Sequence, residues 1–153
     1  ALLISFPASA EKYEGLNQKL YEGGSPDSLS IWVLSDKECP FTQEQLEAAV
    51  RGEIVRARIK PQNKNFDGLE LTYQMTCMGV YRGGTHEGYI GARMLSFEEW
   101  GPAYGSRGSF QPLQGSYGGV MFSGLDGAKE YFLSAAKADI EKALTDFIES
   151  NME

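Results

Sequence analysis

Runs of hydrophobic and polar residues predict four strands along the chain. Residues 29–34 form a nearly continuous apolar run, which is typical of a strand covered on both faces. From Leu69 to Cys77, apolar residues alternate with polar ones, and this period of two indicates a half-buried strand. Residues 89–97 and 116–123 are predicted as two later strands, and a hairpin turn is predicted over residues 81–86.

The strongest local signal is the start of a helix after the first strand. Thr42 is a helix-capping residue, and Gln45 follows three residues later, which completes a capping box. We therefore expect a helix to begin at Gln43. It is expected to end near Ala57, because Pro61 disfavours helical geometry at the residue before it.

Two further segments show the helical period. Residues 128–150 keep an apolar stripe over their whole length, which predicts a long C-terminal helix. A weaker stripe over Glu11 to Tyr21 predicts a short N-terminal helix. Between the last two strands, residues 100–114 are rich in glycine, proline and aromatic residues and read as a long loop or a glycine-loosened hairpin.

The predicted order β-α-β-β-β-α gives an α+β domain. We expect a two-layer sandwich of a mixed four-stranded sheet, with the long C-terminal helix and the capped helix on one face. The other face is expected to be exposed, or covered by the N-terminal helix and the glycine-rich segment. A helix between two strands usually makes the strands parallel, so the first two strands are predicted to be parallel.

The two cysteines are predicted to form one disulfide. In a parallel arrangement, the C-terminal ends of the first two strands meet at one edge of the sheet, where Cys39 and Cys77 would lie. Closing that loop would contribute about 3–4 kcal/mol. A structural disulfide indicates an oxidising compartment, periplasmic or secreted, and the competing interpretation is a pair of free thiols in the cytosol.

The N-terminal residues resemble the end of a secretory signal. Residues 1–10 contain a short apolar run followed by Ala8-Ser9-Ala10, which fits the small-x-small cleavage pattern. The alternative is that Leu2 to Phe6 form an edge strand of the mature chain. In either case residues 11–153 are predicted to form a single domain.

The charge of the chain limits its partners. A formal net charge of -7 argues against nucleic acid or an anionic membrane as the partner, because those surfaces favour clustered Lys and Arg. A basic or neutral partner fits better. There is no apolar run of about 18 residues in the sequence, so no transmembrane segment is predicted.

Catalytic chemistry has few candidates in this sequence. The one histidine, His86, stands beside Glu87 in a predicted turn and is expected to be solvent-exposed. Glu98 and Glu99 are adjacent on a predicted strand, so they would point to opposite faces and would not act on one bond. With one histidine and two distant cysteines, neither a metal site nor a cofactor is expected.

One group of side chains is predicted to bind a partner. Tryptophan, tyrosine and arginine dominate the residues that contribute most to interface affinity, and glycines allow a loop to present them closely. The alternative is that these rings cover the open end of the core. The predicted binding residues of the glycine-rich segment and its borders are Trp100, Tyr104, Arg107, Phe110 and Tyr117.

Three functions follow as hypotheses. The first is a non-enzymatic exported accessory domain that contacts a protein or glycan through the glycine-rich aromatic loop and the exposed sheet face. The second is an acidic periplasmic inhibitor or immunity protein that blocks a toxin or hydrolase, which would bind in a salt-dependent way. The third is a hydrolase that uses Glu and His86. The sequence does not indicate the oligomeric state.

Overall fold

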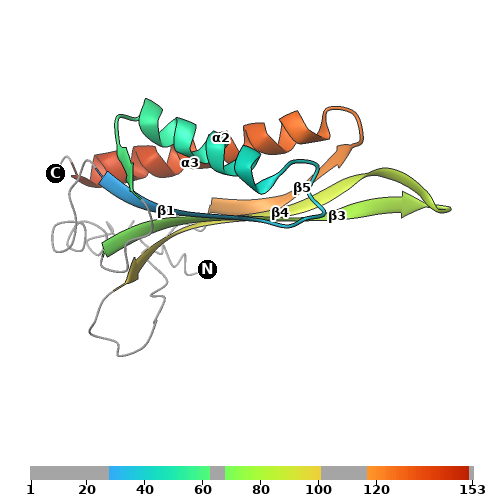
Figure 1. The fold of residues 1–153 in the computed structure, drawn as a ribbon, viewed down its shortest axis with the longest axis horizontal. Coiled ribbons are helices and arrows are strands. Elements are labelled where there is room, and N and C mark those ends of the chain that lie inside the picture. The colour runs from blue at the N-terminus through green and yellow to red at the C-terminus, as the bar shows by residue number, and fades with distance from the viewer. Residues whose placement is uncertain (1–27, 63–67, 101–116, 152–153) are drawn as a thin grey trace, which may run out of the picture.

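The computed structural model describes residues 28–62, 68–100 and 117–151. They form two layers: a twisted sheet and two helices that lie side by side on one of its faces (Figure 1). The elements are β1 (Ser28–Ser35), α2 (Gln43–Arg56), β2 (Lys60–Gln62), β3 (Gly68–Arg82), β4 (Thr85–Trp100), β5 (Tyr117–Gly124) and α3 (Ala128–Asn151). The predicted α+β class, with a long C-terminal helix on one face, is confirmed.

The sheet is mixed, with the strand order β2-β1-β3-β4-β5. β1 is parallel to both β2 and β3, while β3, β4 and β5 form an antiparallel meander. The predicted parallel pairing of β1 with β3 is therefore correct. β3 and β4 form a long hairpin that extends beyond the helices (Figure 1). Its two-residue turn consists of Gly83 and Gly84, whose φ angles of 56° and 84° suit glycine.

The predicted number of strands was wrong by one. Lys60–Gln62 form a fifth strand, β2, in register with residues 28–30 of β1. The sequence predicted the end of a helix and then a polar loop here, because Pro61 disfavours helical geometry at Lys60 and residues 62–65 are all polar. Pro61 also has no N–H to donate to a sheet ladder. An edge strand tolerates proline when that position faces away from its neighbour, and β2 is at an edge.

The helix α2 begins as its sequence predicts. The backbone N–H of Gln45 donates to the Thr42 hydroxyl at 3.3 Å, and the backbone N–H of Thr42 donates to the Gln45 side chain at 3.1 Å. These two bonds form the capping box. The helix ends at Arg56, and the backbone N–H of Ala57 still donates to the carbonyl of Glu53.

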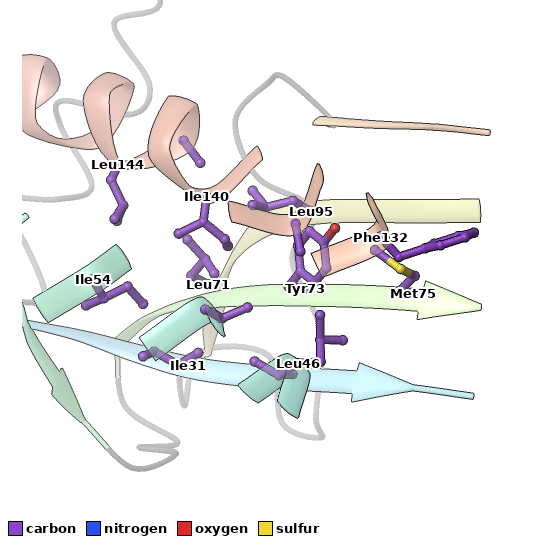
Figure 2. Close-up of a cluster of buried hydrophobic side chains, with 14 of the residues drawn as sticks. Ile31, Leu46, Ile54, Leu71, Tyr73, Met75, Leu95, Phe132, Ile140 and Leu144 are labelled. Atoms are coloured by element: carbon purple, nitrogen blue, oxygen red, sulfur yellow. The ribbon is translucent and has the colours of Figure 1, made fainter. Parts of the chain in front are cut away.

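The hydrophobic core lies between the sheet and the two helices. Figure 2 shows Tyr73 and Leu95 from the sheet facing Phe132 and Ile140 of α3. All four side chains are fully buried. Burial of each such side chain contributes roughly 1.5–3 kcal/mol, so these four residues stabilise the packing of α3 on the sheet.

The predicted disulfide is present. Cys39, in the turn before α2, is bonded to Cys77 of β3, with an S–S distance of 1.97 Å and a Cα–Cα distance of 4.8 Å. Both residues are buried on the side of the sheet that carries the helices. A bridge that closes a 38-residue separation stabilises the fold by about 4 kcal/mol in a chain-entropy estimate.

Candidate binding surface

The face of the sheet opposite the helices carries a group of exposed hydrophobic side chains. We call Met78, Ile90, Met94, Val120 and Phe122 the open-face patch. Their exposed fractions range from 40% for Ile90 to 78% for Val120. Side chains alternate between the two faces of a strand, and the immediate neighbours Cys77, Leu95 and Met121 are buried on the helix side. The patch therefore lies on the side of the sheet away from α2 and α3.

The strand register brings this patch together from three strands. Met78 pairs with Ile90, and Ile90 pairs with Phe122, which forms one row across β3, β4 and β5. Residues paired across strands lie on one face with their side chains in contact range. The next row consists of Thr76, Ala92 and Val120, and the row after it of Gln74, Met94 and Gly118.

This surface carries no charged residue in any of those three rows. Two adjoining positions on β1, Trp32 and Leu34, are also uncharged and half-buried. By contrast, 23% of the residues in the chain are charged. Contiguous exposed apolar areas on a protein surface often mark sites of contact with a partner.

A hollow adjoins the patch where the C-terminal end of β1 lies beside the middle of β3. It has a volume of about 390 Å³ and is lined by Leu34, Ser35, Asp36, Lys37, Gln74, Met75 and Thr76. Gln74 and Thr76 belong to the rows described above. The hollow thus extends the uncharged surface toward two charged side chains, Asp36 and Lys37.

The opposite end of the same face differs. Ser30, Glu70 and Thr72 point away from the helices, yet each is at most 5% exposed. The open face is therefore buried at these three residues and exposed only beyond them. The open-face patch therefore occupies the half of the face nearer the β3–β4 hairpin.

The tip of that hairpin carries an aromatic cluster. The ring of His86 stacks on Tyr81 with centroids 4.8 Å apart and meets the edge of Tyr89 at 4.7 Å. Nε2 of His86 donates to the carbonyl oxygen of Gly88 at 2.9 Å. A carboxylate oxygen of Glu87, the residue that follows His86, lies 3.4 Å from Nε of Arg82. These contacts hold the imidazole within the hairpin.

A charged cluster joins the covered face of the sheet to α3. Nη1 of Arg93 donates to both carboxylate oxygens of Asp139, at 2.9 and 3.0 Å, and the Tyr73 hydroxyl donates to the same carboxylate at 3.3 Å. Burial raises the pKa of Asp139, although Arg93 and Tyr73 oppose the shift. Burial, followed by the charge of Asp139, raises the pKa of the Tyr73 hydroxyl. The cluster positions α3 on the sheet.

Three further features of the described parts of the chain concern a metal site, a second groove and a membrane-spanning helix. Within residues 28–62, 68–100 and 117–151, no group of three or more His, Cys, Asp or Glu side chains is placed to hold a metal ion. A groove of about 200 Å³ between α2 and α3 contains the buried Glu53, which is paired with Arg56 at 2.7 Å. None of the helices in these ranges combines the length and apolar character needed to cross a bilayer.

The residues predicted to bind a partner lie at or beyond the limits of the described structure. Trp100 is the last residue of β4 and Tyr117 is the first residue of β5, so their backbones border the segment 101–116. Tyr104, Arg107 and Phe110 lie outside the described residues, and their role stays a prediction.

Sequence reasoning proposed the exposed face of the sheet as a contact surface but did not identify the residues of the open-face patch. The polar residues Thr72, Gln74 and Thr76 suggested a polar outer face for β3, and Met78 follows the end of the predicted strand. One signal was available: β5 contains the consecutive apolar residues 120–122, although only Met121 is buried among them. An edge strand with apolar residues on both faces indicates a contact on its outer face.

No protein-family model and no curated protein matches this sequence. Two solved structures show a distant likeness. A minor lipoprotein from Acinetobacter baumannii is 13% identical, with a TM-score of 0.38, and the match covers 82% of this chain and 90% of that one. The rare lipoprotein B from Shewanella oneidensis is 14% identical, with a TM-score of 0.34 and coverage of 79% and 92%.

Proposed function

We propose that this protein is an exported, non-enzymatic accessory domain that binds a protein partner through the open-face patch. The observation that carries the proposal is the set of three uncharged rows across β3, β4 and β5, in which five large hydrophobic side chains are exposed. Exposed apolar areas of this kind are typical of protein interaction sites.

The chemistry of the patch favours a protein over a glycan. Glycan sites combine aromatic platforms with hydrogen-bonding groups, whereas four of the five patch residues are aliphatic or methionine. Methionine side chains are flexible and polarisable and recur at surfaces that adapt to apolar partners. Because the three rows carry no charge, the partner surface that complements them is itself apolar and uncharged.

The disulfide supports export. Cys39 and Cys77 are bonded and buried, which is typical of a structural bridge formed in an oxidising compartment. The periplasm and the extracellular space both meet that condition. The segment that contains Tyr104, Arg107 and Phe110 is proposed as a second contact, because its borders are the ends of β4 and β5.

Capture of the partner from the native cell envelope tests this proposal. The face variant Met78→Glu/Met94→Glu places two charges within the patch and away from the sheet edge. We expect it to weaken capture by at least about tenfold, since charges that must be desolvated in an apolar contact cost more than 1 kcal/mol each. The matched control Ala48→Glu/Ala138→Glu adds the same charge at exposed helix positions and is expected to retain full capture.

Two outcomes distinguish binding through the open-face patch from binding through residues 101–116. Equal capture by the face variant and the wild type, with both shown to be folded by circular dichroism, would remove the patch from the binding site. A third variant, with residues 101–116 replaced by a Gly-Ser linker of equal length, tests the second contact. Unchanged capture by that variant would remove the aromatic segment.

The acidic inhibitor is the alternative, supported by the net charge of -7. It predicts binding that falls steeply as salt is added, because screening weakens contacts between exposed charges. Binding through the patch is expected to persist at high salt. The contacts of His86 add no support to the hydrolase hypothesis.

A further inference from the structure

The two edges of the sheet are protected to very different degrees. At one edge, β2 is only three residues long and contains Pro61. Beyond β2, the side chain of Gln43 bonds to the exposed backbone of β1: its amide donates to the Val33 carbonyl at 2.6 Å and accepts from the Ser35 N–H at 2.7 Å. Short strands, proline and side chains that occupy the backbone groups are the usual devices that prevent an edge from pairing with another strand.

The other edge, β5, has none of these features in the described structure. It is eight residues long, Tyr117–Gly124, and contains no proline and no charged residue. It is placed at the end of the strand order and pairs with β4 on its inner side. Gly118, Gly119, Val120, Phe122 and Gly124 are all exposed. An edge of this kind presents backbone donors and acceptors that another strand can satisfy.

Residues 118–124 of β5 are symmetric in residue class about Met121. Val120 and Phe122 flank Met121, Gly119 and Ser123 come next, and Gly118 and Gly124 follow. If two copies of β5 pair antiparallel with Met121 opposite Met121, then from position 118 to position 124 large apolar residues meet large apolar residues and small residues meet small ones. A two-fold contact requires such self-complementarity, because the same surface occurs on both sides.

From this symmetry, and from an edge with which no described strand pairs, we propose that β5 pairs with β5 of a second copy of this chain, antiparallel about Met121, to form one continuous sheet. In this register, Val120 lies opposite Phe122 of the second copy on the open face. Aromatic and β-branched residues form favourable cross-strand pairs. The proposal goes beyond the binding function, because it concerns the edge of the sheet.

Charge supports a second copy as the occupant. Each chain carries a net charge of -7, so two copies repel each other at most contacts. β5 has no charged residue, and the neighbouring patch rows have none. Pairing at this edge therefore places no like charges opposite each other, and it joins the two open-face patches into one larger surface.

A pair of double variants tests both the interface and its register. Val120→Glu/Phe122→Glu places like charges opposite each other across the two-fold axis. Val120→Glu/Phe122→Lys places each Glu opposite a Lys of the second copy. Like charges in direct cross-strand pairs are destabilising and opposite charges are stabilising, so we expect the dissociation constant of the first variant to exceed that of the second by at least about tenfold.

Sedimentation velocity of the purified, oxidised full chain, from about 1 to about 100 μM, measures the association. We expect the wild type and the Glu/Lys variant to dimerise, and the Glu/Glu variant to be monomeric. A wild type that stays monomeric throughout would overturn the proposal, and equal association of the two variants would overturn the register. Both variants place charges on the open face, so loss of envelope capture by a dimeric Glu/Lys variant would concern the binding function alone.

Discussion

The two faces of the sheet are formed by the same strands, β3, β4 and β5, but they differ in how far their hydrophobic side chains are buried. On the covered face, Tyr73, Met75 and Leu95 are fully buried against the helices, and the charges of Arg93 and Asp139 are paired. On the open face, Met78, Ile90 and Met94 of the same strands are 40–63% exposed. Hydrophobic side chains on the covered face stabilise the fold, whereas those on the open face leave apolar area in water.

Stability of the fold explains the hydrophobic residues of the covered face, but it does not explain those of the open face. Exposed apolar side chains contribute little to stability and favour unwanted association, so solubility alone would favour polar residues at these positions. The uncharged rows are consistent with a surface that is kept for a partner. Matched substitutions on the two faces test whether only the covered face contributes to stability.

The largest difference is expected for two methionines of β3. Met75 is fully buried under α3 and Met78 is 63% exposed, only three residues along the strand. Met75→Ala is expected to lower the free energy of unfolding by about 2–5 kcal/mol, because it leaves a cavity in the core. Met78→Ala is expected to change it by less than about 0.5 kcal/mol. Urea unfolding of both variants, followed by circular dichroism, measures the two values, and similar losses would show that the open face also belongs to the core.

A smaller difference is expected for two glycines on the covered face. A Cβ atom at Gly91 of β4 would overlap the buried ring of Phe132, whereas a Cβ at Gly119 of β5 would lie 3.8 Å from the Arg93 guanidinium, an ordinary contact distance. Gly91→Ala is therefore expected to destabilise the fold by about 1–3 kcal/mol through overpacking. Gly119→Ala is expected to have an effect within about 0.5 kcal/mol. Thermal melts of the two variants at equal concentration provide the measurement, and a Gly91→Ala variant as stable as the wild type would contradict the close packing of Phe132 on β4.

The covered face was largely predictable from sequence because its signals are local. Thr42 and Gln45 define the start of α2 within four residues, and the alternation from Leu69 to Cys77 identifies which side of β3 is buried. The disulfide followed from one topological rule, that a strand-helix-strand unit is parallel. Each of these inferences needs only neighbouring residues or a general preference of protein chains.

The open face and the edges were not predictable in this way. Met78, Ile90 and Phe122 form one row only because of the register between β3, β4 and β5, and a single sequence does not specify that register. Strand β2 depends on pairing with β1 rather than on its own composition, which includes Pro61. The aromatic and arginine set around Phe110 stays a prediction, since it lies outside the described residues.

The smallest effect concerns the charged cluster of the covered face and depends on pH. Burial raises the pKa of Asp139 above its ordinary value of 3.8, so the folded state holds this proton more tightly than the unfolded state does. The stability that protonation provides is present at low pH and is lost as pH rises through the raised pKa. Asp139→Asn cannot titrate. The stability of the wild type relative to this variant should therefore fall as pH rises from about 3 toward neutrality.

Urea unfolding of both proteins across this pH range measures the difference. Arg93→Gln sharpens the test, because the Arg93 guanidinium, whose Nη1 lies 2.9 Å from the carboxylate, lowers the pKa of Asp139. Its removal should move the fall in stability to higher pH, when compared with an Arg93→Gln/Asp139→Asn reference. A relative stability that rises with pH would mean that attraction to Arg93 outweighs burial, and the cluster would then act as a stabilising ion pair at neutral pH.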